Sequence, residues 1–420
     1  MLAAVWELSL ATGASKREGR LISGEMRASR GSRVKPSPQA DSIYLAQPST
    51  RAWRFLDLFR VASSRTLTLT AIAVAVAWIP PAALSALRGG ASFLSFLTDY
   101  ATQSRFLIVI PVLILAEKPL HVRLTQVVHH FETFFVQPAE LPQFQVNWAS
   151  YEQLRNSRLA RVSMILLTYT TAIWLAGYLN PRGTEFVSWW TGGGGYRYFS
   201  PAGTWAVFVS YAVLVYFTFL WLWRQFLWAR FLRATTRLNL RLIAAHPDHL
   251  GGLGFLEASL LGQLPFSFCL GVGLAGAIAN RVLHAGQNLM AFRFLAPALI
   301  ATVLLICVAP HFLFTRTLMQ MRRSGMLRYG ALARTVGEQF ERKWLGQTES
   351  LEDDVLGAHD FSATTDLFSV VENIDKIRVI PISLVDLYAI VIAALVPAIP
   401  VVLASIPFNV LIRAALKLLV

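Results

Sequence analysis

The sequence predicts an all-α protein, a polytopic bundle of transmembrane helices with helical extensions in the cytoplasm. Residues 204–223 (TWAVFVSYAVLVYFTFLWLW) form an uncharged run that is long enough to cross the hydrocarbon core as one helix, at about 1.5 Å per residue. Hydrophobic residues make up 55% of the 420-residue chain and charged residues only 15%, whereas soluble domains contain about 25% charged residues. Hydrophobic regions recur along the chain, so we expect about seven spans, or six if the last region re-enters the membrane without crossing it.

Basic residues are distributed unevenly, and this distribution predicts the topology. Of the 38 lysines and arginines, 30 lie in residues 1–65, 117–161, 224–255 and 316–383, whereas residues 88–105, 180–203 and 281–293 hold only six. Because cytoplasmic segments of membrane proteins carry an excess of Lys and Arg, we expect the N-terminus in the cytoplasm and the 180–203 loop outside. The same topology explains the formal net charge of +14, so we expect no nucleic-acid partner.

The N-terminal part is predicted to contain a tail, an interfacial helix and the first span. Residues 1–40 are small, basic and turn-rich, which predicts a disordered tail. Residues 41–65 are predicted to form an interfacial helix, because Trp53 and Phe55 share one helical face with other apolar residues. The first span, at about 66–87, should bend at Pro80 and Pro81.

The rest of the predicted transmembrane bundle, 66–315, alternates spans with loops. The second to sixth spans are predicted at about 104–116, 159–179, 204–223, 256–280 and 294–315, with cytoplasmic loops at 117–158 and 224–255. The short run at 104–116 should continue as a helix to His130, and residues 131–158 should then form a loop. In the external loop, Trp189 and Trp190 are expected at the level of the lipid headgroups.

Glycines and prolines give further predictions for the second half of the chain. Gly271, Gly273 and Gly276 match GxGxxG, but no strand precedes them, so we interpret them as positions of close helix packing. Residues 316–383 are predicted to form a cytoplasmic helical segment that becomes acidic and irregular after residue 345. Several prolines interrupt the hydrophobic region at 384–420, which predicts a kinked span or a re-entrant hairpin.

The sharpest local motif is HPDHLGGLGFLE, residues 246–257, at the predicted cytoplasmic end of the fifth span. Its candidate ligand or gating residues are His246, Asp248, His249, Gly251, Gly252 and Glu257. The favoured interpretation is a structural turn in which Asp248 caps the following helix and the glycines allow close backbone approach. A ligand or gating site is the alternative. A metal site is least favoured, because the spacing matches no standard set of metal ligands.

Four further residues in the predicted spans need an interpretation. His311 and Asp386 are additional ligand or gating candidates, because ionisable groups in or near spans are often functional. Cys269 and Cys307 lie in different predicted spans and are interpreted as small packing residues rather than a disulfide or a metal pair. We therefore expect no catalytic residue, no bound metal and no cofactor.

The string AHPDHLGGLGFL at 245–256 resembles the HPD-x-x-GGL-x-FL signature of a family of uncharacterised bacterial integral membrane proteins. Residues 104–120, 360–383 and 395–416 are similar to segments of the same family. The resemblance covers about 41–420 and implies a multi-pass protein of the bacterial inner, or cytoplasmic, membrane. It implies no biochemical activity.

Among function classes, we favour a channel or transporter, because the chain combines several spans with a Pro-broken last region and polar residues inside spans. A membrane scaffold or signalling protein that acts through its cytoplasmic segments is the alternative. A membrane-embedded enzyme is least favoured, because no catalytic motif is visible. The expected partner is the lipid bilayer, and both a second copy of the chain and a cytoplasmic protein stay open as partners.

The predicted topology can be tested by cysteine labelling of intact cells. Cysteines introduced at Thr191, in the 180–203 loop, and at Ser324, in the basic 316–383 segment, should lie on opposite sides of the membrane. We predict that a membrane-impermeant thiol reagent labels only the cysteine at position 191. Labelling only at position 324 would show that the orientation is reversed.

Overall fold

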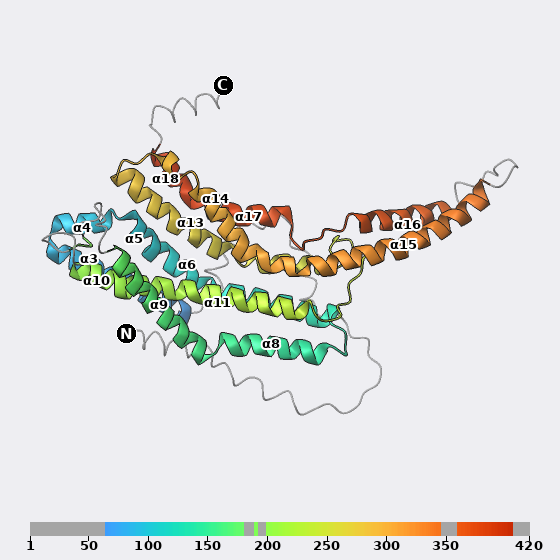
Figure 1. Cartoon of the computed structure of the whole chain (residues 1–420), viewed down its shortest axis with the longest axis horizontal. Coiled ribbons are helices and arrows are strands. Elements are labelled where there is room, and N and C mark those ends of the chain that lie inside the picture. Colours follow the sequence, from blue (N-terminus) through green and yellow to red (C-terminus); the bar gives the residue numbers. More distant parts are fainter. Residues whose placement is uncertain (1–63, 180–188, 192–198, 346–358, 406–420) are drawn as a thin grey trace, which may run out of the picture.

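The computed structural model describes residues 64–179, 189–191, 199–345 and 359–405, and these form an elongated bundle of roughly parallel and antiparallel helices (Figure 1). The described part of the chain is helical and contains no β-strand, only two isolated bridges, so the all-α prediction is confirmed. The tail at 1–40 and the interfacial helix, except its last two residues, lie outside the described residues. The two ends of the bundle differ. We call the end from which α15 and α16 extend the arm end, and the end near α4 and α10 the opposite end.

The helices follow one another along the chain with few long connections. The first half contains α3 (Ser64–Arg88), α4 (Gly90–Leu97), α5 (Tyr100–Ser104), α6 (Ile110–Leu115), α7 (Glu117–His130), α8 (Leu141–Arg155) and α9 (Arg158–Leu179). The second half contains α10 (Pro201–Trp205), α11 (Tyr211–Thr235), α12 (Glu257–Leu261), α13 (Leu264–Ala279), α14 (Leu295–Val303), α15 (Thr315–Trp344), α16 (His359–Asp375), α17 (Leu384–Leu395) and α18 (Ile399–Ser405). Short π-helical and 3-10 turns join several of these into longer rods.

Five of these rods are long and apolar enough to cross a membrane, judged by length and composition. They are Ser64–Arg88, Pro201–Thr235, Leu253–His284, Leu289–Trp344 and Leu384–Ser405. The predicted spans at 104–116 and 159–179 are also helical, in α5 to α6 and in α9, but they are not among the five.

Three segments differ from their predicted local structure. The predicted loop at 131–158 contains α8, which begins just before Pro142, where a proline is tolerated because the first-turn N–H groups have no helical partner. The predicted loop at 224–255 is helical up to Thr235, because α11 continues past its uncharged part. The irregular segment after residue 345 contains α16, whose charged and apolar residues alternate at helical spacing.

The last hydrophobic region forms one interrupted helix in the described residues rather than a hairpin. Helices α17 and α18 are joined by the 3-10 turn Val396–Ala398, which contains Pro397. Because proline lacks an N–H group, it interrupts the helical hydrogen bonds at this turn without reversing the chain. Helix α18 ends at Ser405, and the region from 406 lies outside the described residues.

Helix α13 is central to the bundle, because it packs against α5 on one side and against α17 on another. A Cβ atom at Gly271 would overlap the backbone of Ala394 in α17, and one at Gly276 would overlap Ser104 and lie 3.0 Å from the carbonyl oxygen of Tyr100. Gly273, in contrast, has no heavy atom within 4 Å of a Cβ position. The packing interpretation therefore holds for Gly271 and Gly276 and is wrong for Gly273.

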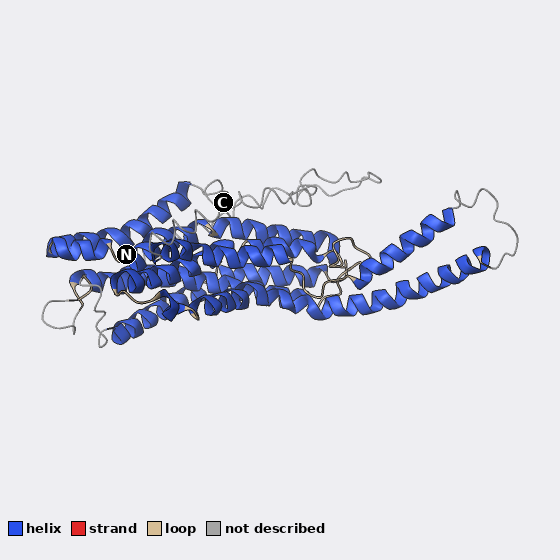
Figure 2. Ribbon diagram, turned by 90° about the horizontal axis from the view of Figure 1, so that it is seen from above, coloured by secondary structure: helices blue, strands red, loops and turns tan. Residues whose placement is uncertain are grey.

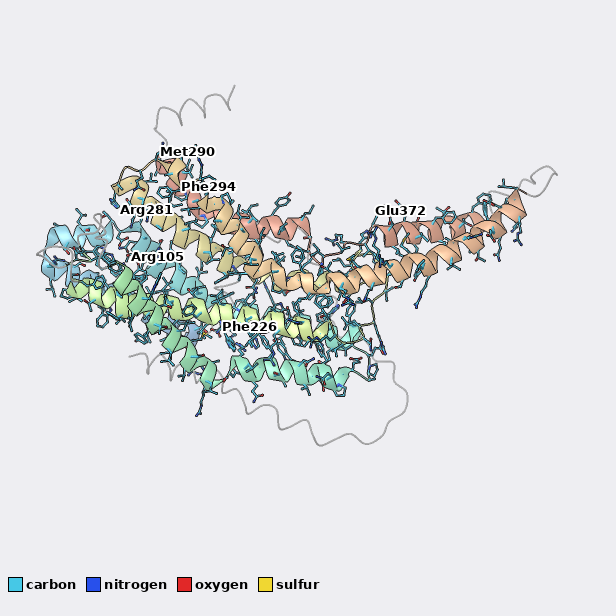
Figure 3. All side chains as sticks on the ribbon, viewed as in Figure 1. Arg105, Phe226, Arg281, Met290, Phe294 and Glu372 are labelled. Atoms are coloured by element: carbon cyan, nitrogen blue, oxygen red, sulfur yellow. The ribbon has the colours of Figure 1, made fainter. Side chains whose placement is uncertain are left out.

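Helices α15 and α16 form a hairpin, the arm, that extends beyond one end of the bundle (Figure 2). Near its tip, the ring of Phe361 packs against Phe340 and Trp344, with ring centroids 4.9 and 5.1 Å apart. Near its base, Arg322 of α15 forms an ion pair with Asp375 of α16 at 2.7 Å. Figure 3 labels Glu372, which precedes Asp375 by three residues on the same helix. The two helices are thus held together at both ends.

The packing of α13 predicts different effects for two alanine substitutions. Gly271→Ala should force α13 and α17 apart and lower the free energy of unfolding by about 1–3 kcal/mol, the usual cost of overpacking. Gly273→Ala is the matched control and should be neutral or slightly stabilising, because alanine favours helix and meets no neighbour. Thermal unfolding in detergent measures both. Equal melting temperatures for the two variants would contradict this packing.

Candidate functional site

The predicted HPD turn folds around the carboxylate of Asp248. Oδ1 accepts the backbone N–H groups of Leu250 at 2.8 Å and Gly252 at 3.0 Å, and Oδ2 accepts that of Gly254 at 2.9 Å. The Nδ1 atom of His246 lies 2.8 Å from Oδ1. Both oxygens are therefore occupied by groups of the turn itself, as expected for a structural cap.

The charge of Asp248 is maintained by these hydrogen bonds. Burial alone would raise the pKa of the carboxyl group, but the three backbone N–H groups and His246 outweigh burial and lower the pKa. Asp248 is thus ionised at neutral pH. Since its folded-state pKa lies below the usual value of 3.8, its ionisation stabilises the fold above that pH and the stabilisation is lost as the pH falls below it.

The two glycines of the motif let the turn pack against neighbouring elements. Both have positive φ, +65° at Gly251 and +96° at Gly252, a conformation that other residues rarely adopt. A Cβ atom at Gly251 would overlap Met321 of α15, and one at Gly252 would lie 2.7 Å from the ring of Phe135. The turn is therefore wedged between the base of the arm and the segment after α7.

Arg378, which the sequence analysis did not identify, joins the turn to the segment that follows the arm. Its backbone N–H donates to the carbonyl oxygen of His249 at 2.9 Å, and its guanidinium group donates to the carbonyl oxygens of Asp248 at 3.4 Å and Ile382 at 3.1 Å. Glu257 lies 3.7 Å from the same guanidinium group. The structure thus gathers the motif residues into one joint between the arm and the bundle.

The other two predicted candidates lie near this joint but have separate surroundings. His311 is buried in the 3-10 turn Ala309–Phe314, and its Nε2 atom lies 2.9 Å from the hydroxyl oxygen of Ser259. Asp386 is buried in the first turn of α17, where its Oδ2 accepts the hydroxyl hydrogen of Ser383 at 2.6 Å. Ser259 connects His311 to the end of the motif, because its hydroxyl also donates to the carbonyl oxygen of Leu256 at 2.7 Å.

A line of buried polar side chains runs along the rod Leu253–His284. Ser259, Gln263 and Ser267 are spaced four residues apart, so they lie on nearly the same face, and all three are buried. The carbonyl oxygen Oε1 of Gln263 has no hydrogen-bond partner among the described residues. Ser267 lies 3.9 Å from the thiol of Cys307. We call these three residues the polar line; Asn280 lies on the same rod, thirteen residues beyond Ser267 and on a different face.

Asn280 belongs to a second cluster, at the opposite end of the bundle, that the sequence analysis missed. The carboxylate of Asp99, only 3% exposed, accepts the Nδ2 of Asn280 at 2.7 Å and both the backbone N–H and the hydroxyl of Thr102 at 3.1 and 2.7 Å. It also accepts the indole N–H groups of Trp189 and Trp190 at 3.2 and 3.3 Å. The two tryptophans are therefore buried on this carboxylate inside the protein, and their depth at the level of the headgroups stays a prediction.

Three π-helical turns lie in helical rods that contribute to this cluster or pack against it. They are Arg105–Val109, Ala206–Ser210 and Asn280–His284. Arg105, labelled in Figure 3, begins the first of them and donates from Nη1 to the hydroxyl of Tyr211, which follows the second, at 3.0 Å. Since π-helical turns are rare and are often found at functional sites, this cluster is a second candidate region.

The two cysteines are not bonded to each other, and the described residues include no metal-binding cluster. Cys269 and Cys307 are both buried and free. Over the described ranges, no group of three His, Cys, Asp or Glu side chains is placed to hold a metal ion.

The geometry of the HPD turn predicts a pH-dependent effect of Asp248→Asn. An amide has one acceptor oxygen, so the variant loses the bond to Gly254 and should be destabilised by about 1–3 kcal/mol at pH 7. The difference from the unchanged protein should shrink as the pH falls from 3.8 through the lowered pKa of folded Asp248, where this carboxylate becomes protonated. Asp375→Asn, in an exposed ion pair, is the control and should cost about 1 kcal/mol or less.

Thermal unfolding between about pH 3 and about pH 8 measures this dependence, because this range includes the pH at which carboxyl groups titrate. A stability difference for Asp248→Asn that stays constant over the whole range would show that the charge of the turn is not what stabilises it.

The chain matches no known family model, and it is not significantly similar to any curated protein or solved structure.

Proposed function

We propose that this chain is a multi-pass integral protein of the bacterial inner membrane with channel- or transporter-like activity. The proposal includes about seven spans, a cytoplasmic N-terminus and the arm in the cytoplasm, together with the resemblance to the HPD membrane-protein family. It is supported by five rods of sufficient length and apolarity. It is also supported by large apolar side chains exposed on the outside of the bundle, such as Leu166, Trp174 and Leu305.

One observation carries the transport part of the proposal, namely the polar line on the rod Leu253–His284. In a bundle surrounded by lipid, a buried polar group without a partner is costly, so such groups are retained mainly where they serve function. Gln263 Oε1 and Asn280 Oδ1 are both buried carbonyl oxygens without a partner among the described residues. Since a carboxylate only accepts hydrogen bonds, Asp99 fixes the Asn280 amide with Nδ2 toward it, so Oδ1 is the free acceptor.

These acceptors define the chemistry of the solute. Neutral carbonyl oxygens suit a small cation or a solute with hydrogen-bond donors, and they do not suit an anion. The central glycines of α13 bring it close to both α5 and α17, so a small relative shift of these helices would change access to the polar line.

The arm favours a second candidate function, a scaffold or signalling protein. Its helix α15 is 30 residues long, and Leu327 and Leu332 on it are exposed. Arg378 holds the segment that follows the arm to the HPD turn, so binding of a partner to the arm could be transmitted to the bundle.

An enzyme is supported least. Ser259 and His311 form a Ser–His contact, but the single hydroxyl hydrogen of Ser259 is directed to the carbonyl oxygen of Leu256 at 2.7 Å. The Nδ1 atom of His311 has no hydrogen-bond partner among the described residues, so no acidic residue orients the ring as a general base requires.

Flux into proteoliposomes tests the transport proposal, with rubidium ions as the cationic probe and glycerol as the neutral polar probe. The unchanged protein should admit at least one probe faster than protein-free liposomes do. Gln263→Leu removes the unpartnered carbonyl group at nearly constant volume and should reduce that flux at least about tenfold, a change equivalent to one lost polar contact.

Gln225→Leu is the matched control. Gln225 is a buried amide on α11, outside the polar line, and its Nε2–H donates to the carbonyl oxygen of Ile306 at 3.1 Å. The flux through the Gln225→Leu variant, normalised to the amount of folded protein, should equal that of the unchanged chain. Unaltered flux in Gln263→Leu, or flux equal to that of empty liposomes for both probes, would contradict the proposal.

A further inference from the structure

A second charged cluster lies on α7, α8 and α11, apart from both the HPD turn and the polar line. The Oε1 atom of Glu117 lies 2.5 Å from Nη2 of Arg224 and 3.6 Å from Nη2 of Arg155. Arg155 also donates from Nη1 to Nε2 of His121 at 3.3 Å. The arginine side chains are only 12% and 19% exposed and that of Glu117 is 35% exposed, so these four residues form a partly buried network.

The charges of this network do not balance. Burial raises the pKa of Glu117, but Arg224 and Arg155 outweigh this and lower it, so Glu117 is ionised. Burial and the nearby Arg155 lower the pKa of His121 to about 4, so His121 is neutral at pH 7. Two guanidinium groups thus face one carboxylate, which leaves one positive charge in excess.

The neighbouring groups do not remove this excess. Burial lowers the pKa of Arg155, and the charge of Arg224 lowers it further, while Glu117 opposes them. Glu152, the next carboxylate on α8, is exposed and acts on Arg155 less than Glu117 does. Hydrogen-bond donors are also in excess. Because Arg155 donates to Nε2, the ring hydrogen of His121 is on Nδ1, which has no partner among the described residues.

The position of the network identifies the environment of this charge. Arg224 is the first charged residue after the uncharged run 204–223, and Arg158 begins α9, one of the predicted spans. In the proposed membrane topology, the network therefore lies at the cytoplasmic end of the spans, at the depth of the lipid phosphates.

We propose that Arg155 and Arg224 form a binding site for an anionic phosphate group, which neutralises their excess positive charge. Guanidinium groups recognise phosphate through paired N–H donors, and basic sites between helices at the cytoplasmic face bind the headgroups of anionic lipids. The phosphate can belong to a lipid or to a free anion. The proposal rests on the membrane location but not on transport, so a negative flux result leaves it intact.

Thermal unfolding of the full-length protein in a non-ionic detergent tests the site, with phosphatidylglycerol, phosphatidylcholine and inorganic phosphate added separately. Phosphatidylglycerol should raise the melting temperature more than zwitterionic phosphatidylcholine does. If inorganic phosphate gives the same increase, the ligand is the free anion, and if it gives none, the ligand is the lipid headgroup. An equal effect of phosphatidylcholine and phosphatidylglycerol would overturn the proposal.

Two substitutions should change the response in opposite directions. Arg155→Gln removes the excess charge but keeps the Glu117–Arg224 pair, so about tenfold more anion should be needed for the same increase in melting temperature. Glu117→Gln increases the excess charge and should lower the concentration needed.

Arg334→Gln, on the exposed surface of the arm, is the matched control and should respond like the unchanged protein. If Arg155→Gln does not fold, Arg155→Lys should fold and retain the response, because it keeps the charge. An undiminished response in Arg155→Gln, a weaker response in Glu117→Gln, or an equal loss in Arg334→Gln would each overturn the proposal.

Discussion

The close approach of α13 to α5 and α17 is the constraint on which the rest of the bundle depends. Gly271 and Gly276 leave no room for a side chain at these two crossings, so the backbones themselves are in contact. This contact brings the end of α13 to Asp99 and places Ser267 opposite Cys307. It also removes the side chains of one face of the helix from any solvent, so each polar group on that face has to find a partner within the protein.

The two ends of the molecule satisfy this requirement in different ways. At the opposite end, the carboxylate of Asp99 receives five donors and is fully satisfied, which fixes the tryptophan segment and α13 to α5. At the arm end, Asp248 is equally satisfied by its own turn, and Arg378 uses the outer carbonyl groups of that turn to hold the segment after the arm. Between these rigid ends, Gln263 retains an acceptor without a partner, which is why we assign function to the middle of the bundle and not to the HPD turn.

Long apolar runs made the helices themselves predictable, and the spacing of Asp248 before its glycines made the capping turn predictable. Helix α8 was not predictable in this way, because its hydrophobic residues are mostly isolated and two prolines flank its start. Asp99 and Arg378 were missed for a different reason. Their partners lie far away in sequence, Asn280 at 181 residues from Asp99 and Asp248 at 130 residues from Arg378, and no local pattern connects them. The error at Gly273 is similar, since spacing alone does not show which glycines of a helix face a neighbour.

The central claim is that the polar line is reached by water and solute, although its side chains are buried in this conformation. The most direct measurement is the reactivity of a cysteine at Gln263 toward a small water-soluble thiol reagent, in protein reconstituted in lipid after Cys269→Ala and Cys307→Ala. A cysteine at Leu305, a residue that is 71% exposed on the apolar surface, is the lipid-facing reference. Our account predicts that Gln263→Cys reacts faster than Leu305→Cys and that rubidium ions or glycerol slow the reaction. No reaction at position 263 from either side of the membrane would contradict the account, since the polar line would then be a sealed part of the core.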